Sequence, residues 1–124
     1  MSNIGLDLCN PKRIERIYKR FGPKFLKRVL TEKEIEELKK NMKNFIHRLA
    51  ARYAAKEAVA KSFGTGIGKK LSFQDLEILK NEVGAPIVHL NEKAQKLAES
   101  LGYSEVKVSI SHEDLLVGAV AIAQ

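Results

Sequence analysis

The stretch RLAARYAAKEAVAKSFGTGIGKK, residues 48–70, decides how this chain folds. It is rich in small and apolar residues and runs into a glycine-rich loop, so we expect a long helix over residues 42–63 that stops at Gly64. On a helical wheel, which advances about 100° per residue, one broad face collects the apolar residues. These are Ile46, Leu49, Ala50, Tyr53, Ala54 and Ala60. Glu57 lies in the middle of this face, although a glutamate on a helix ordinarily faces solvent.

Two interpretations of Glu57 stay open from the wheel alone. Glu57 can pair with Lys61 four residues later, which stabilises a helix by only about 0.2–0.5 kcal/mol. Alternatively, its carboxylate points into a partly buried site, where it needs a cation or a metal ion nearby.

Asp7 raises the same question near the start of the chain. Residues 4–9 alternate as in a half-buried strand, with Ile4, Leu6 and Leu8 on one face and Gly5, Asp7 and Cys9 on the other. An aspartate in a strand commonly faces solvent, but Asp7 can meet Glu57 if this strand packs beside the long helix. Two adjacent carboxylates repel unless one is protonated or a cation lies between them. Mg²⁺ suits such a pair, because it binds one or two carboxylates together with substrate phosphates.

The loop GTGIGKK is not a Walker A phosphate-binding loop. Phe63 stands where the first glycine of that motif belongs, and Lys70 stands where Ser or Thr belongs. The loop also follows a helix, so the negative end of the helix dipole is nearest. Any phosphate affinity here must come from Lys61, Lys69 or Lys70, or from backbone amides. The alternative is a glycine stop that leads into a strand.

The remaining segments complete a single α+β domain over residues 1–124. We expect helices over residues 11–21, 24–30, 32–40 and 92–101. Strands are expected over residues 4–9, 71–79, 86–90, 106–110 and 115–123, the last two as a hairpin.

The composition indicates a cytosolic protein. No apolar run approaches the roughly 20 residues of a membrane span, and the N-terminus lacks the layout of a signal peptide. Cys9 is the single cysteine, which excludes an internal disulfide and a metal site of four cysteines.

The excess of positive charge is confined to one part of the chain. The formal net charge is +7, and residues 11–28, the basic segment, carry eight basic residues and one acidic residue, Glu15. The basic residues are Lys12, Arg13, Arg16, Lys19, Arg20, Lys24, Lys27 and Arg28. This segment also contains Tyr18, Phe21 and Phe25. It is either a solvated helix face or a surface that docks an anion-rich partner, with an association rate that falls as salt is added.

His112, in the motif VSISHED, follows the end of an expected strand. Loops at strand ends commonly carry functional groups. An exposed turn residue is the alternative.

These pieces together resemble the bacterial holo-[acyl-carrier-protein] synthase family, the short type of 4′-phosphopantetheinyl transferase. The matching motifs are GLDL followed by Arg13, RYAAKEAVAKSFGTGIG followed by LSFQDLEI, Pro86 in GAP, and VSISH before the apolar last strand. They occur in the family's order and spacing from residue 5 to the C-terminus.

The resemblance implies a fold and a reaction. The fold is a long central helix on a mainly antiparallel sheet, one half-unit per chain. The reaction moves 4′-phosphopantetheine from coenzyme A to a serine of apo acyl carrier protein, for fatty acid biosynthesis. Asp7 and Glu57 would hold Mg²⁺, and both would be catalytic together with Lys61. Glu57, through a water molecule, is the first candidate for the general base, and Asp7 is the second.

The resemblance also implies binding residues and an assembly. Coenzyme A would contact Arg52, Lys61, Gly64, Thr65, Gly66, Pro86 and His112. The acidic carrier protein would contact Arg13, Arg20, Lys24, Phe25 and Arg28. A cytoplasmic homotrimer with active sites at subunit interfaces is expected, with neither nucleic acid nor membrane as a partner.

Two other functions compete with this one. The basic segment can be the arm of a small nucleic-acid-binding protein, which explains the charge but not the positions of Glu57 and Asp7. The chain can also be an interaction module that binds an acidic protein without chemistry.

Overall fold

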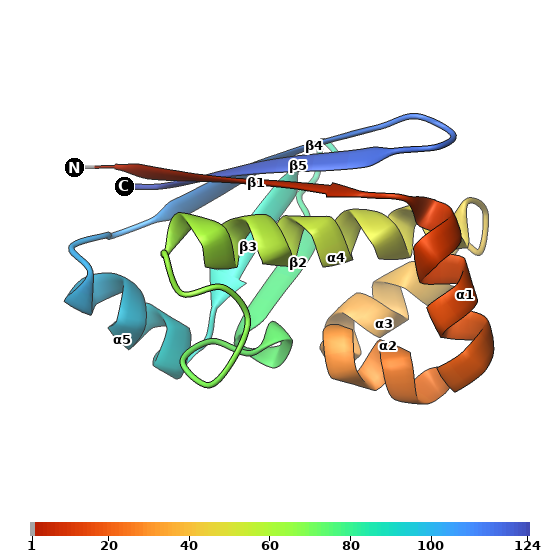
Figure 1. The fold of residues 1–124 in the computed structure, drawn as a ribbon, viewed down its shortest axis with the longest axis horizontal. Helices are drawn as coiled ribbons and strands as arrows, with labels where there is room; N and C mark the ends of the chain where they lie inside the picture. The colour runs from red at the N-terminus through yellow and green to blue at the C-terminus, as the bar shows by residue number, and fades with distance from the viewer. Residues whose placement is uncertain (1) are drawn as a thin grey trace.

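The long helix α4 (Phe45–Ser62) lies along one face of a three-stranded antiparallel sheet (Figure 1). The computed structural model describes residues 2–124. The sheet has the order β1-β5-β4, formed by β1 (Asn3–Cys9), β5 (Val117–Ala123) and β4 (Val106–His112). A separate antiparallel hairpin joins β2 (Leu76–Lys80) to β3 (Pro86–Leu90). The expected α+β class, with a long helix on a mainly antiparallel sheet, is confirmed.

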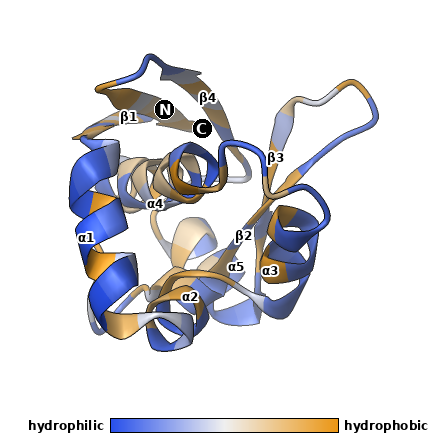
Figure 2. Cartoon of the chain, turned by 90° about the vertical axis from the view of Figure 1, so that its right-hand side faces the viewer, coloured by the Kyte–Doolittle hydropathy of each residue, from blue (hydrophilic) through white to orange (hydrophobic). Residues whose placement is uncertain are grey.

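The shorter helices lie at the two ends of α4 (Figure 1). At one end are α1 (Pro11–Phe21), α2 (Pro23–Val29) and α3 (Glu32–Lys39), and at the other is α5 (Glu92–Ser100). Figure 2 shows that α1 is mostly hydrophilic, as its basic residues require. Within residues 2–124, no helix is both long and apolar enough to cross a bilayer.

The contact between β1 and α4 is unusually close. Leu49, Ala50, Ala54 and Ala58 of α4 are fully buried, and three of the four are alanines with little side chain to hold a strand away. A Cβ atom added to Gly5 would lie 2.0 Å from the Ala58 carbonyl oxygen and 2.6 Å from the Ser62 amide nitrogen. Backbone atoms of a helix cannot give way by that much, so β1 reaches this position only because residue 5 is glycine.

The alternation of β1 is confirmed, but its apolar residues face outward. Ile4, Leu6 and Leu8 are 63%, 58% and 59% exposed, whereas Gly5 and Cys9 face α4 and Cys9 is buried. Val120 and Ile122 of β5 lie opposite Leu6 and Ile4 in the register. We call the set Ile4, Leu6, Leu8, Val120 and Ile122 the outer sheet face.

Four expected boundaries are wrong by two residues or more. The strand expected over residues 106–110 continues to His112, so His112 is the last residue of β4 and does not follow the strand. The long helix begins at Phe45, because Asn44 takes a left-handed conformation with φ 56°. The expected strand over residues 71–79 begins only at Leu76, because Ser72 and Asp75 form a capping box around a short 3₁₀ helix (Phe73–Asp75). The last strand begins at Val117, since Leu115 and Leu116 lie exposed in the turn after β4.

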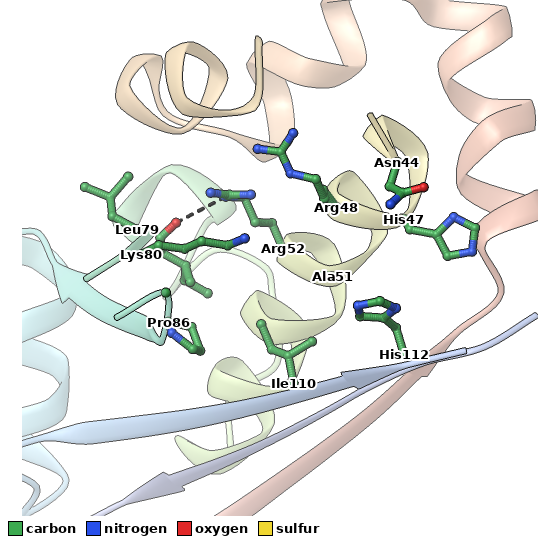
Figure 3. A pocket seen from close by; sticks show the side chains of 12 residues that line it. Asn44, His47, Arg48, Ala51, Arg52, Leu79, Lys80, Pro86, Ile110 and His112 are labelled. Carbon is green, nitrogen blue, oxygen red and sulfur yellow. Dashed lines mark hydrogen bonds between the residues drawn. The ribbon is translucent and has the colours of Figure 1, made fainter. Parts of the chain in front are cut away.

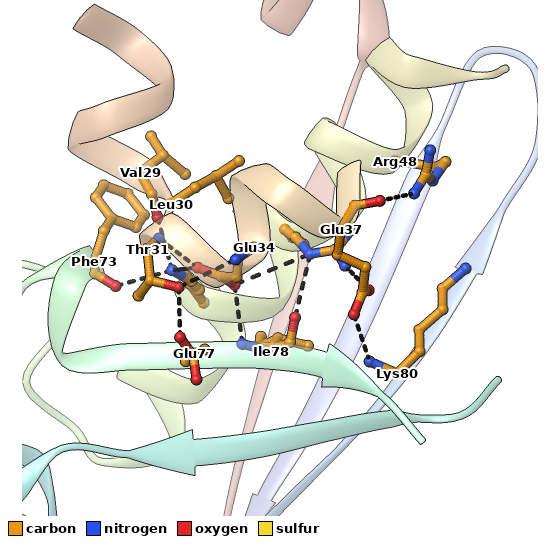
Figure 4. A network of polar contacts seen from close by, with 12 residues as sticks. Val29, Leu30, Thr31, Glu34, Glu37, Arg48, Phe73, Glu77, Ile78 and Lys80 are labelled. Carbon is orange, nitrogen blue, oxygen red and sulfur yellow. Dashed lines mark hydrogen bonds and ion pairs between the residues drawn. The ribbon is translucent and has the colours of Figure 1, made fainter. Parts of the chain in front are cut away.

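A buried polar network joins α3 to α4 and β2 (Figure 4). Lys56 and Glu34 are both fully buried, and Lys56 Nζ lies 2.6 Å from Glu34 Oε1. Lys56 also donates to the carbonyl oxygens of Val29 at 2.7 Å and Phe73 at 3.0 Å. Burial lowers the pKa of Lys56, and the charge of Glu34 opposes that effect. A buried charge with this many partners is tolerated only while all of them stay in place, so the network fixes the orientation of α4.

We predict that Gly5→Ala destabilises the protein by about 3 kcal/mol or more, the upper part of the range for overpacking, because its new Cβ would overlap the backbone of α4. Gly118→Ala in β5 is the matched control, since its Cβ would meet the flexible end of Leu8 at 3.3 Å and the Ser111 carbonyl oxygen at an ordinary contact distance of 4.0 Å. Urea unfolding of both variants measures the two changes. Equal stability of the two variants would show that the packing of β1 on α4 does not require a glycine at position 5.

Candidate active site

Asp7 and Lys61 meet where β1 crosses the C-terminal half of α4. Asp7 follows Gly5 by two residues and therefore faces α4 from the same side of the strand. Lys61 Nζ donates to Asp7 Oδ1 at 3.0 Å and to the Leu6 carbonyl oxygen at 3.0 Å. The Asp7 side chain is 14% exposed and that of Lys61 is 50% exposed. The pair thus lies at the edge of the interior, open to solvent on the side of Lys61.

Glu57 lies one helical turn before Lys61 and close enough to Asp7 to be affected by its charge. Partial burial raises the pKa of Glu57 above its ordinary value, and repulsion from Asp7 raises it further. Lys61 and Arg13 oppose both effects. The structure therefore brings Asp7, Glu57 and Lys61 together, although the chain segments that carry them are about 50 residues apart.

The donor set at this point fits Mg²⁺. Within residues 2–124 no cluster of three or more His, Cys, Asp or Glu side chains could enclose a metal ion. Two partly exposed carboxylates are an incomplete oxygen shell, and Mg²⁺ characteristically completes such a shell with water and substrate phosphates. Asp7 and Glu57 are the residues that would hold it.

Arg13 lies beside the carboxylates as well as in the basic segment. Its guanidinium carbon lies 5.8 Å from the centre of the Tyr53 ring, and its charge acts on Glu57. Tyr53 precedes Glu57 by one helical turn. The stacking of Arg13 on Tyr53 therefore holds the start of α1 against the side of α4 that carries Glu57. Arg13 was expected only to bind the partner protein.

The glycine loop is a helix stop. Gly64 and Gly66 have φ values of 79° and 65°, which other residues rarely adopt. The Gly64 amide donates to the Lys61 carbonyl oxygen at 3.0 Å, and the Gly66 amide donates to that of Ala60 at 3.1 Å. Because these two amides satisfy the end of α4, they are not free to form a phosphate-binding nest. Thr65 Oγ1 donates to the Gly66 carbonyl oxygen at 3.0 Å, within the same loop.

A second group of expected residues lines a cavity of about 350 Å³ beside the N-terminal half of α4 (Figure 3). Arg52, Pro86 and His112 all border it. The sequence did not point to Asn44, His47 and Lys80, which border it as well. The ring centres of His47 and His112 are 6.4 Å apart, and His47 Nε2 lies 2.9 Å from the Asp114 carbonyl oxygen. The wheel could have found His47, which lies one turn before the cavity residue Ala51.

Arg52 lines this cavity, but its guanidinium group is already paired within the protein. Its side chain is 5% exposed, its Nε donates to the Ile78 carbonyl oxygen at 3.2 Å, and its guanidinium pairs with Glu37. A helix turns by about 140° over the five residues between Arg52 and Glu57. The cavity and the carboxylates therefore face different sides of α4 within one chain.

The basic segment borders a third feature, a largely apolar cavity of about 410 Å³. Lys24 and Arg28 lie at its border, and Phe25, Tyr53 and Phe73 are among the residues that line it. Phe25, expected to contact the carrier protein, is only 8% exposed. Phe21 is the exposed aromatic residue, and the Arg20 guanidinium carbon lies 5.2 Å from its ring centre.

Comparison with known proteins places this geometry in a family. The model of the ACPS family, described as the 4′-phosphopantetheinyl transferase superfamily, matches residues 3–120. A holo-[acyl-carrier-protein] synthase of Ruminiclostridium cellulolyticum is 44% identical over 109 residues, which cover 88% of this chain and 81% of the relative. One of Caldanaerobacter subterraneus is 44% identical over 97% of this chain and 92% of its own length.

Solved structures agree with the sequence comparison. The holo-[acyl-carrier-protein] synthase of Neisseria meningitidis superposes with a TM-score of 0.92 at 38% identity, over 98% of this chain and 97% of that one. The Helicobacter pylori enzyme, solved in complex with coenzyme A, superposes with a TM-score of 0.86 at 35% identity, over 98% of this chain and 99% of that one. This chain therefore belongs to the ACPS family of the 4′-phosphopantetheinyl transferase superfamily.

Proposed function

We propose that this chain transfers 4′-phosphopantetheine from coenzyme A to a serine of apo acyl carrier protein and releases adenosine 3′,5′-bisphosphate. The observation that carries the proposal is the cluster of Asp7, Glu57 and Lys61 in a chain of this family. Its relatives are named holo-[acyl-carrier-protein] synthases, and the H. pylori structure contains coenzyme A. Cytoplasmic location and the absence of a nucleic-acid partner remain predictions.

Each of these three residues would have its own role in the transfer. Asp7 and Glu57 would hold Mg²⁺, which supplies positive charge to the diphosphate of coenzyme A when bound. Lys61 donates hydrogen bonds to a phosphate oxygen. Glu57 accepts the proton of the serine hydroxyl through a water molecule as the serine oxygen attacks the β-phosphorus, with Asp7 as the second candidate. The bond from that phosphorus to the bridging oxygen breaks, and this oxygen leaves as part of adenosine 3′,5′-bisphosphate.

The cavity beside Arg52 suits the nucleotide end of coenzyme A. Ala51, Ile78 and Ile110 give it apolar walls for an adenine ring. Lys80 and His112 place donors at its border for a phosphate. Arg52 supports this wall through Glu37 and Ile78, so its part in binding is to shape the cavity.

We also propose that three chains assemble and that each active site lies between two of them. The carboxylates and the cavity face different sides of α4, so one coenzyme A molecule reaches both only if a second chain supplies one of them. The outer sheet face offers an apolar surface for that contact, because Ile4, Leu6 and Leu8 are each more than half exposed. Contiguous exposed apolar surface of this kind commonly marks an interface.

The basic segment is the proposed docking surface for the acidic carrier protein. Lys24 and Arg28 border an apolar cavity, and a charged border around an apolar centre is the usual layout of a protein interface. Arg13 connects this surface to Glu57, so a docked partner would present its serine next to the carboxylates.

The first test is to incubate the protein with coenzyme A, Mg²⁺ and an apo carrier protein and to weigh the carrier. We expect a mass gain of one phosphopantetheine, and we expect Glu57→Gln to lower kcat/KM by at least about 100-fold, the usual share of a general base. No mass gain with the unmodified protein would contradict the proposal and favour nucleic-acid binding by the basic segment.

The stability of Glu57→Gln separates lost chemistry from lost folding. The folded pKa of Glu57 lies above its unfolded value, so ionisation of this carboxylate costs stability once the pH rises through that range. In EDTA at pH 7, the variant should therefore melt at a higher temperature than the unmodified protein. The gain should disappear by about pH 4, where the carboxyl group is largely protonated in both states.

We predict that Arg28→Glu raises the KM for the carrier protein roughly tenfold while the affinity for coenzyme A is unchanged. Lys96→Glu on α5 is the matched control, because it makes the same charge change at the opposite end of α4 (Figure 1) and loses only an exposed pair with Glu92. Steady-state kinetics at low salt measures both. An equal rise in KM for the two variants would indicate an effect of total charge and not of docking.

We predict that Ile122→Glu converts trimers to single chains, because it places a charge within the outer sheet face, on the central strand β5. Val83→Glu is the control, since Val83 is 86% exposed in the turn between β2 and β3, outside that face. Light scattering after size exclusion gives both masses. A trimer that survives Ile122→Glu would rule out this face as the contact.

A further inference from the structure

Lys61 is the internal cation of the two-carboxylate cluster. Its ammonium group lies 3.0 Å from Asp7 Oδ1 and 3.0 Å from the Leu6 carbonyl oxygen. Within residues 2–124, no other basic side chain forms an ion pair with Asp7, and Glu57 forms none. The carboxylate that would hold a divalent ion is thus already paired with a lysine of the same chain.

We propose that Lys61 is an exchangeable counter-ion, which holds Asp7 in the free protein and moves to the phosphates when metal and coenzyme A bind. The proposal rests on the proposed function, since it assigns Asp7 and Glu57 to Mg²⁺. Two cations beside one carboxylate repel each other, so the pair between Lys61 and Asp7 weakens binding of the metal. The diphosphate of coenzyme A gives Lys61 another anion, so each ligand favours the binding of the other.

The surroundings of Lys61 allow this movement. Half of its side chain is exposed, and its ammonium group donates to one carboxylate oxygen and one carbonyl oxygen of β1. β1 is an edge strand, so that side of it is not covered by another strand. A lysine carries its charge on a flexible four-carbon stem, and the ammonium group can change partners without a movement of α4.

Lys56, on the same helix, shows the opposite arrangement. It is fully buried, and its ammonium group has three fixed acceptors, on Val29, Glu34 and Phe73. Moving it would leave the buried Glu34 with only Arg52, whose Nε lies 4.0 Å away, as a cationic neighbour (Figure 4). The two lysines of the motif AAKEAVAK therefore differ in kind, since Lys56 is a fixed structural charge and Lys61 is a mobile one.

The test is to titrate Mg²⁺ into the unmodified protein, Lys61→Met and Lys96→Met by calorimetry, each with and without coenzyme A. Without coenzyme A, Lys61→Met should bind Mg²⁺ roughly tenfold more tightly than the unmodified protein, because a charge next to Asp7 is gone. Lys96→Met makes the same change in total charge on α5 and should match the unmodified protein. Coenzyme A should strengthen Mg²⁺ binding strongly in the unmodified protein and much less in Lys61→Met.

The outcomes distinguish this proposal from the proposed function. If Lys61→Met binds Mg²⁺ no more tightly than the unmodified protein, while both bind it with coenzyme A present, the counter-ion exchange is wrong and the metal site stands. If the unmodified protein binds no Mg²⁺ even with coenzyme A, both are wrong. A purely structural role for Lys61 would not produce tighter metal binding. Circular dichroism of Lys61→Met checks that the variant is folded.

Discussion

The contact of Gly5 with the backbone of α4 is the constraint on which the other features depend. Because no side chain separates β1 from Ala58 and Ser62, the strand lies directly on the helix. Asp7, two residues later on the same side, is then held beside the residues that follow on α4. The antiparallel register with β5, in which Asp7 lies opposite Ala119, fixes the strand along its length. The acid pair is a consequence of backbone packing.

The charges on α4 serve two different purposes. Arg52 and Lys56 point into the protein, where Glu34 and Glu37 of α3 balance them and hold the helix against rotation. Glu57 and Lys61 lie on the side that β1 crosses, where solvent can still enter. A helix held this firmly by one set of charges can present the other set at a constant position, which a site for charged substrates requires.

Local sequence patterns predicted the boundaries of helices and strands correctly where a single local interaction determines them. The glycine stop at Gly64 and the helix start at residue 32 were predicted correctly because each depends on residues close together in the chain, the second through a capping box of Thr31 and Glu34. The start predicted for the strand over residues 71–79 was wrong, because the capping box of Ser72 and Asp75 outweighed the apolar pattern. The burial of Arg52 was missed because its partner Glu37 is 15 residues away in the chain.

The sequence by itself determined the long helix, the single carboxylate in its apolar face, the localised positive charge and the family. Periodicity fixes the side of an element on which a residue lies, but it does not fix which other element covers that side. Only the tertiary structure brought Asp7 to Glu57 and Lys61, turned the apolar residues of β1 outward, and separated the cavity at Arg52 from the carboxylates. Contacts between segments distant in sequence depend on packing, which no local pattern records.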